Sequence, residues 1–363
     1  MLKFEIKAKE DKARTGNIKI GAKEVSTPLF VPQSSGLAVP AMFPESVKES
    51  GTEMLFADTY RLLMRSGLDV VKAAGGIKPF TGWSGIVFSD SGSTGVYRTD
   101  VYRKAKEEGL FYASYIDGSR HKITPEYSVS VQEKLGSDII LGLYEEASLG
   151  GNRMKIGKLL RRTARWNRRA KDAFHPKGEQ AFFGVITGGA YADLRESSLK
   201  LTVPLKPDGF LQAPPLPGEN RKAWLRAVAA STMLLPEDKP CAVLGLQSIP
   251  EILECIASGM DLLISDIAPL KGLSGIALTD SGEIDFHDNR YFSDSEPLMS
   301  GCPCPACRSY TRAYLHHLTV AGELLGSTLL TWHNLVYMNR LFQSVHKAIN
   351  SGCFADFMKA KGL

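Results

Sequence analysis

The chain has 363 residues, of which 44% are hydrophobic and 23% charged, a composition typical of globular proteins that excludes a disordered chain. The net charge of +5 is modest for this length and indicates no strong overall electrostatic field. No run approaches the roughly 18 apolar residues of a membrane helix. The first residues lack the apolar core of a signal peptide. We therefore expect a cytoplasmic protein with no membrane partner.

Short apolar strands alternate with helices along most of the chain. Residues 15–33 predict a pair of strands near the start. Further strands are predicted at 53–59, 85–91, 138–144, 180–189, 206–214, 241–247 and 261–267, and helices at 43–50, 124–137, 154–175, 220–235 and 249–259. This alternation is typical of a parallel sheet covered by helices. About seven or eight such units favour a closed (β/α)8 TIM barrel over an open sheet.

Polar residues occur where several predicted strands end. In a (β/α)8 barrel the active site lies at the carboxyl ends of the strands. The residues in these positions are Asp58, Asp90, Glu145, Thr187 and Asp266. They are the first candidates for a catalytic site.

A strongly basic stretch follows the third of these strands. Nine lysines and arginines lie between Arg153 and Lys171 and cover much of the surface of the predicted helix. Such a surface is either a solvated helix face or a phosphate-binding patch, and the sequence leaves both open.

Three cysteines crowd together near the C-terminus. Cys302, Cys304 and Cys307 have the spacing C-x-C-x2-C, so three thiolates on a proline-rich turn can converge on one tetrahedral ion. A histidine further along completes a closed, structural Cys3His zinc site. The candidates are His316, His317 and His333. We favour His333, which is predicted to open a helix after a helical stretch that turns the chain back.

The chain shows no linker or internal repeat. We therefore predict a single TIM-barrel domain over residues 1–363, with a zinc-binding subdomain at about 285–345 inserted near its C-terminus.

Residues 301–335 resemble the zinc module of the tRNA-guanine transglycosylases, the queuine/preQ1 tRNA-ribosyltransferase family, which carries C-x-C-x2-C-x25-H. Family segments also recur in the same order at 88–92, 117–140, 162–171, 183–198 and 235–262. The resemblance covers nearly the whole chain, which is identified as a divergent member.

The resemblance implies a TIM barrel with structural Zn²⁺ and a transferase reaction on tRNA in queuosine synthesis. Guanine at the wobble position is exchanged for a 7-deazaguanine-type base through a covalent aspartyl-ribose intermediate. The target base leaves its neighbours to enter the pocket. The implied partners are tRNA, a purine or 7-deazapurine base, and a family member in a homodimer or heterodimer.

The family's residues carry over unevenly. Asp90 matches a catalytic aspartate, but Ser93-Thr94-Gly95 replaces the family's Gly-Phe-Gln, so the stacking aromatic is missing. Tyr144 takes the place of an aspartate that grips guanine, and Thr187 that of a glutamine. The residues assigned to base binding by this resemblance are Ser91, Tyr144, Glu145, Thr187, Gly188, Ala213 and Pro214.

The position of the nucleophile is altered. A gapless alignment places Ile264 where the family has its nucleophilic aspartate, and Asp266 follows two residues later. A shift of two strand residues moves a side chain by about 6.6 Å unless the strand ends or bulges there. The arginines that read the anticodon become Leu270 and Leu273, which leaves Lys271 as the expected RNA contact.

Two alternatives remain beside an enzyme that uses Asp266 and Asp90. The first alternative is a non-catalytic paralogue or partner subunit that binds tRNA or a transglycosylase. The second is a glycosidase that releases a base without replacing it. For Glu145, the alternative to base binding is an ion-paired acid at the end of the barrel.

Overall fold

The computed structural model describes residues 2–99, 103–146, 152–176, 178–215 and 217–363. Eight strands, all paired in parallel, close into a barrel in chain order, which confirms the predicted (β/α)8 fold. They are β4 (Leu29–Ser34), β5 (Met54–Ala57), β6 (Ile86–Ser89), β10 (Ile139–Leu141), β11 (Ala181–Ile186), β12 (Gly209–Gln212), β13 (Cys241–Leu244) and β14 (Leu262–Ser265). All except β4 lie inside ranges predicted as barrel strands.

The start of the chain differs from its prediction. Residues 15–33 contribute to three strands rather than two: β2 (Ala13–Ile20), β3 (Lys23–Thr27) and β4. The first two form an antiparallel sheet with β1 (Lys3–Glu10), whereas β4 is the first strand of the barrel. Ile18 and Val25 pack with inward-facing barrel residues, so this sheet covers the amino end of the barrel.

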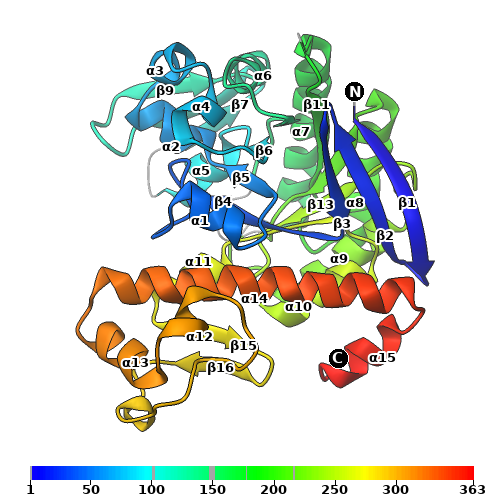
Figure 1. Ribbon diagram of the computed structural model, residues 1–363. Coiled ribbons are helices and arrows are strands. Elements are labelled where there is room, and N and C mark those ends of the chain that lie inside the picture. Colours follow the sequence, from blue (N-terminus) through cyan, green and yellow to red (C-terminus); the bar gives the residue numbers. More distant parts are fainter. Residues whose placement is uncertain (1, 100–102, 147–151, 177, 216) are drawn as a thin grey trace.

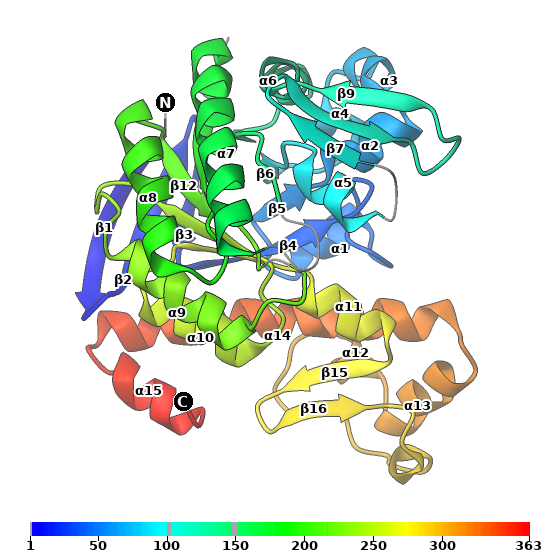
Figure 2. The ribbon, with the colours of Figure 1, turned by 180° about the vertical axis from the view of Figure 1, so that it is seen from behind.

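Helices surround the barrel on its outside (Figures 1 and 2). They are α1 (Pro44–Glu49), α2 (Thr59–Arg65), α3 (Leu68–Ala73), α4 (Ile77–Thr81), α5 (Ser93–Arg98), α6 (Pro125–Lys134), α7 (Arg153–Ala173), α8 (Ala192–Thr202) with the 3-10 turn η1 (Val203–Leu205), α9 (Arg221–Thr232), α10 (Ile249–Ala257) and α11 (Ile267–Leu273). Among the described residues, no helix has the length and apolarity needed to cross a membrane.

The barrel interior is filled by alternate strand residues. On β14, Leu262 and Ile264 belong to the interior cluster, whereas Leu263 packs outward against the helices. This alternation follows from the two-residue period of a strand. Because side chains fill the barrel, a substrate must bind at its mouth.

A small antiparallel sheet is inserted between α5 and α6. It consists of β7 (Arg103–Lys106), β8 (Gly109–Ala113) and β9 (Arg120–Ile123). Tyr112 of this sheet packs edge-on against Tyr60 of α2, with ring centroids 5.2 Å apart. The sheet therefore lies beside the helices that follow β5 and β6.

The C-terminal part forms a compact module around one long helix. The elements are β15 (Ile276–Thr279), β16 (Gly282–Asp285), η2 (Asn289–Tyr291), α12 (Pro305–Ser309), α13 (Arg312–Val320), α14 (Leu324–Asn350) and α15 (Phe354–Ala360). Figure 1 shows α14 running along the barrel, with α13 near its first end, the β15–β16 hairpin below its first half and α15 at its other end.

Two contacts fix α14 against the rest of the fold. Gly272 of α11 lies so close to it that an added Cβ would stand 2.5 Å from the backbone nitrogen of Thr331. The amide of Asn339 donates to the Ser50 carbonyl at 2.9 Å. The helix thus belongs to both the module and the barrel.

Candidate functional site

The four predicted zinc ligands come together in the C-terminal module. Cys302, Cys304, Cys307 and His333 are buried, and their ligand atoms lie within 4.8 Å of one another. The His333 Nδ1 atom is 3.7, 3.5 and 3.2 Å from the three Sγ atoms in that order. A tetrahedral zinc ion with bonds of about 2.3 Å to sulfur and 2.0–2.1 Å to nitrogen separates these atoms by roughly 3.5 Å. The residues fit a closed, structural zinc site.

A hydrogen bond to His333 fixes the protonation of its ring in the form that binds a metal. Its Nε2 atom lies 2.8 Å from the Leu278 carbonyl, so a proton there leaves Nδ1 free to bind the ion. The prediction that His333 opens a helix is wrong, because α14 begins at Leu324 and places the histidine inside it. His316 is occupied elsewhere, with Nδ1 2.8 Å from the Phe286 carbonyl.

A second polar site lies at the mouth of the barrel. It is a cavity of about 80 Å³ at the carboxyl ends of the neighbouring strands β14, β4, β5 and β6. Asp90 and Asp266, the two predicted catalytic residues, both line it. We call it the catalytic pocket; its other described lining residues include Gln33, Ser34, Ser35, Asp58, Arg61, Thr94, Arg98 and Leu270. It is smaller than typical ligand pockets of about 300–1,000 Å³.

Asp90 directly follows β6 and is completely buried. Its carboxylate accepts hydrogen bonds from the Gly92 amide at 2.9 Å and the Thr94 hydroxyl at 3.0 Å. Burial, and then the negative charge of Asp58, raise the pKa of Asp90 to about 7. Near neutral pH this group can therefore both give and take a proton.

Asp266 directly follows β14, which ends at Ser265. The backbone turns there into α11, so Asp266 is not one strand pleat further along but stands at the start of a helix. Its side chain is 29% exposed, and Arg98 Nη1 lies 3.6 Å from its Oδ2 atom. Ile264, which the resemblance places at the nucleophile position, is fully buried inside the barrel.

Two of the residues predicted to bind the base, Tyr144 and Ser91, are buried near Asp90. Tyr144 is fully buried in the barrel interior, and its hydroxyl shares a 2.7 Å hydrogen bond with Thr94. Ser91 is buried, and its hydroxyl donates to Ser93 at 3.2 Å. Neither is among the described residues that line the catalytic pocket. Thr94 thus connects the Tyr144 hydroxyl to the Asp90 carboxylate by hydrogen bonds.

Glu145 forms the ion pair that we weighed against base binding. Arg162 of α7 donates to both of its carboxylate oxygens, at 2.9 and 2.7 Å. Burial raises the pKa of Glu145, an effect that Arg162 opposes. The contact fixes the chain after β10 to α7.

The remaining base-binding candidates lie at the ends of β11 and β12. The buried Thr187 hydroxyl has no hydrogen-bond partner among the described residues. Gly188 has φ +139°, and an added Cβ would stand 2.7 Å from the Arg195 amide nitrogen. Ala213 is buried, and Pro214 next to it is partly exposed. None of these residues lines the catalytic pocket as far as the described residues show.

The predicted RNA contacts carry ion pairs of their own. Lys271 Nζ lies 2.7 Å from Glu283 Oε2. On α7, Arg165 pairs with Glu107 and Arg169 with Glu126. Structural pairing therefore accounts for part of the basic surface of this helix.

Two residues of the catalytic pocket, Gln33 and Arg98, were not among the residues predicted from the sequence. Arg98, on α5, is held by the Gln33 side-chain oxygen at 2.7 Å. The Gln33 Nε2 atom is buried without a hydrogen-bond partner among the described residues, so it is a donor available to a substrate. Burial also raises the pKa of Asp58. The polar strand ends and the family resemblance both indicated this site, but neither indicated Arg98, which lies eight residues after Asp90 at the end of α5.

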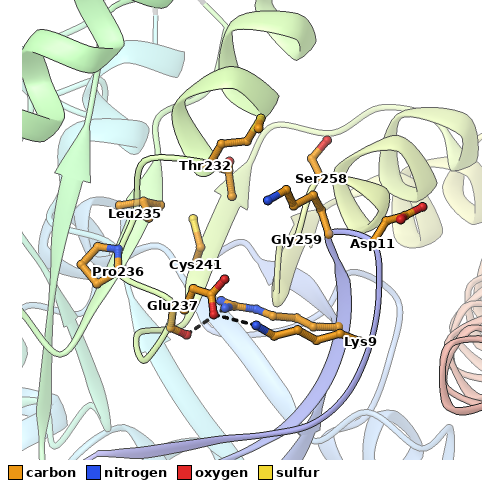
Figure 3. A pocket seen from close by; sticks show the side chains of 12 residues that line it. Lys9, Asp11, Thr232, Leu235, Pro236, Glu237, Cys241, Ser258 and Gly259 are labelled. Atoms are coloured by element: carbon orange, nitrogen blue, oxygen red, sulfur yellow. Dashed lines mark hydrogen bonds and ion pairs between the residues drawn. The ribbon is translucent and has the colours of Figure 1, made fainter.

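Another pocket, at the amino end of the barrel, is occupied by its own ion pairs. It lies between the β1–β2 turn and the ends of α9 and α10 (Figure 3). Lys9 pairs with Glu237 at 2.6 Å. Arg14 donates to both carboxylate oxygens of Asp261, at 2.9 and 2.6 Å. Asp261 thus has a structural role at the opposite end of β14 from Asp266.

Comparisons with known proteins agree with the geometry. The family model described as queuine tRNA-ribosyltransferase matches residues 9–361. A queuine tRNA-ribosyltransferase of Cereibacter sphaeroides is 36% identical over 357 residues, covering 98% of this chain and 95% of that protein. The Rickettsia akari protein of the same name is 35% identical over 354 residues, or 98% of each chain. The Zymomonas mobilis protein is 34% identical over 358 residues, covering 98% and 93%. The chain therefore belongs to the queuine tRNA-ribosyltransferase family.

Proposed function

We propose that the protein exchanges guanine in a tRNA for a 7-deazaguanine-type base, with Asp266 as the nucleophile and Asp90 as the group that transfers protons. The activity follows from the family. The residue roles rest on one observation: Asp90 and Asp266 line the same pocket at the carboxyl ends of the barrel strands. Active sites of this fold lie at that end.

The proposed reaction has two displacements. A carboxylate oxygen of Asp266 forms a bond to ribose C1′, the glycosidic bond breaks, and its electron pair leaves with guanine, which takes a proton from Asp90. The incoming base then attacks C1′, the bond to Asp266 breaks, and Asp90 recovers a proton from the base. A pKa of about 7 suits Asp90 to both steps.

Two polar groups support this arrangement. Arg98 positions the Asp266 carboxylate through their 3.6 Å contact. The unpaired Gln33 amide, which lines the same pocket, is a donor that a bound nucleoside would satisfy. Zinc supplies no chemistry here: bound to the three cysteines and His333, it would hold the C-terminal module together.

The finer assignments are also part of the proposal. Of the residues that the resemblance assigns to the base, we retain Thr187, Gly188, Ala213 and Pro214. Ser91, Tyr144 and Glu145 are not retained, because Tyr144 is fully buried inside the barrel, the Ser91 hydroxyl is hydrogen-bonded to Ser93, and Glu145 is paired with Arg162. We assign an RNA phosphate to Lys271. We expect the wobble nucleotide as the target, a dimer with a family member as the active form, and the cytoplasm as the location because tRNA is the substrate.

The test is incorporation of radiolabelled guanine into tRNA by the purified protein and by Asp266→Asn. The native protein is expected to incorporate label and to form a tRNA adduct that survives denaturation. Asp266→Asn is expected to do neither, because an amide is a poor nucleophile. The Asp266 side chain caps no helix amide, so the variant should remain folded.

Asp356→Asn is the matched control, because Asp356 is 79% exposed on α15. Incorporation by Asp266→Asn at the native rate would contradict the nucleophile assignment. Release of guanine without incorporation would identify a glycosidase instead. Binding of tRNA without either reaction would identify a non-catalytic paralogue.

A further inference from the structure

A second, larger groove adjoins the catalytic pocket. Its volume is about 440 Å³, compared with about 80 Å³ for the pocket. It lies between the loop after β4, helix α2 and the chain beyond β8. We call it the flanking groove; its described lining residues are Ser35, Gly36, Arg61, Arg65, Thr99 and Tyr115.

The flanking groove is continuous with the catalytic pocket. Ser35 and Arg61 line both. A chain that places one unit in the catalytic pocket can therefore place the next unit in the groove. A free base has no such second unit, whereas a nucleotide within RNA does.

The groove carries positive charge on one helix face. Arg61 and Arg65 are four residues apart on α2, which puts them on the same side of the helix. Arg61 contacts Asp58 only loosely, at 3.5 Å. Within the described residues, Arg65 has no carboxylate partner. These guanidinium groups are suited to a phosphate, which they can bind with two parallel hydrogen bonds.

An aromatic ring forms another wall. Tyr115 is partly exposed, and its ring is tilted against Tyr60 with centroids 5.9 Å apart. The Arg65 Nε donates to the Tyr115 hydroxyl at 2.9 Å, and the guanidinium carbon lies 5.8 Å from the ring centroid. An aromatic ring beside arginines is the usual surface for an unstacked RNA base and its phosphate.

The opposite side of the catalytic pocket is different. On α11, Leu270 and Leu273 are 50% and 44% exposed. Lys271, between them, shares its charge with Glu283. On the α2 side, by contrast, Arg65 has no carboxylate partner among the described residues and Arg61 has only a 3.5 Å contact with Asp58, so a polyanion would be attracted there.

We propose that the flanking groove binds the RNA nucleotide next to the one in the catalytic pocket, with its phosphate on Arg61 and Arg65 and its base against Tyr115. The proposal rests on the proposed function, because it requires an RNA whose target nucleotide occupies the pocket. Arg61, Arg65 and Tyr115 then contribute to RNA affinity without contacting the reacting atoms.

The experiment measures binding of a fluorescent RNA stem-loop that carries the target guanine, at several salt concentrations. Arg65→Gln is expected to weaken binding and to reduce the slope of log affinity against log salt by about 1, because one phosphate contact is lost. Tyr115→Leu is expected to weaken binding about 5- to 150-fold, as loss of one stacked base does. Tyr115→Phe keeps the ring and should keep most of the affinity.

Arg226→Gln is the charge-matched control, because Arg226 is exposed on α9, away from the groove. A second RNA that ends at the target nucleotide should bind Arg65→Gln, Tyr115→Leu and the native protein alike. Unchanged affinity and salt slope in Arg65→Gln and Tyr115→Leu would overturn the groove assignment, while guanine incorporation by the native protein would leave the proposed function intact. Failure of the native protein to bind RNA or incorporate guanine would overturn both.

Discussion

The zinc centre and the catalytic pocket are both built from buried polar groups, but they are encoded differently. Three zinc ligands lie within six residues, and the fourth comes from one adjoining helix. The catalytic pocket collects side chains from the ends of four strands and from α5. When the ligands of a site lie close together in the sequence, their spacing alone indicates the chemistry of the site. A site assembled from separate strands is not encoded by the spacing of neighbouring residues, so the sequence indicates it less directly.

The largest effect is expected at the zinc centre. Cys304→Ser should abolish metal binding and destabilise the module by several kcal/mol, since structural zinc in small zinc-finger peptides contributes about 10–16 kcal/mol. Zinc content per chain and the melting temperature measure this. Cys353→Ser, at an exposed cysteine outside the cluster, should change neither. One tightly bound zinc per chain in Cys304→Ser would refute the ligand assignment.

At the catalytic pocket, the next largest effect separates two positions on β14. Ile264→Asp places a carboxylate at the position where the resemblance expects the nucleophile, but buries it among apolar residues. We expect a loss of about 3–5 kcal/mol in unfolding free energy, the cost of an unpaired buried charge. We also expect no rescue of guanine incorporation in the Asp266→Asn background. Rescue with native stability would show that Ile264 faces the ribose after all.

The third prediction concerns the pH dependence of stability. The pKa of Asp90 is raised to about 7 in the folded protein, so the folded state binds the proton more tightly than the unfolded chain. The stability that the folded protein gains from this proton is fully present below about pH 4 and is lost as the pH rises through about 7. In the native protein, the free energy of unfolding should therefore fall by a few kcal/mol between about pH 4 and pH 7 because of Asp90. Asp90→Asn should remove this fall, which urea unfolding at each pH measures.

Other groups near Asp90 affect this experiment. Asp58, Tyr144 and Glu146 interact with it electrostatically. The pKa of Glu146 is also raised to about 7, mainly by burial, so part of the decline should persist in Asp90→Asn. Asp58→Asn removes a like charge and should shift the midpoint of the decline to lower pH. The same slope in the native protein and in Asp90→Asn would show that Asp90 is not the titrating group.

The smallest effect is expected at Tyr144. Tyr144→Phe removes the 2.7 Å hydrogen bond to Thr94 while keeping the ring that fills the barrel. A single hydrogen bond contributes about 0.5–1.5 kcal/mol, so we expect a loss of this size in unfolding free energy. Tyr60→Phe is a ring-preserving control, since its buried hydroxyl has no hydrogen-bond partner among the described residues. A loss above about 3 kcal/mol would indicate that the hydroxyl organises more than Thr94.

The sequence was a good guide where the signal is local. The barrel strands could be predicted because each is a short apolar run, and the zinc ligands because of their spacing. The exception was β4. It begins only two residues after β3 ends, so the sequence predicted two strands over residues 15–33 where the structure has three. The role of Arg98 could not be predicted, since its contact with Asp266 joins residues on α5 and after β14 that only barrel closure brings together.

The position of α14 has a consequence for how the two sites depend on each other. His333 lies in the zinc cluster, and the next residue, Asn334, donates to the Ala268 carbonyl of α11 at 3.1 Å. Asp266 stands at the start of that same short helix. Adjacent residues of α14 therefore join the zinc cluster to the helix that begins at Asp266. A zinc ion that takes no part in the proposed reaction would thus help to hold the proposed nucleophile in place.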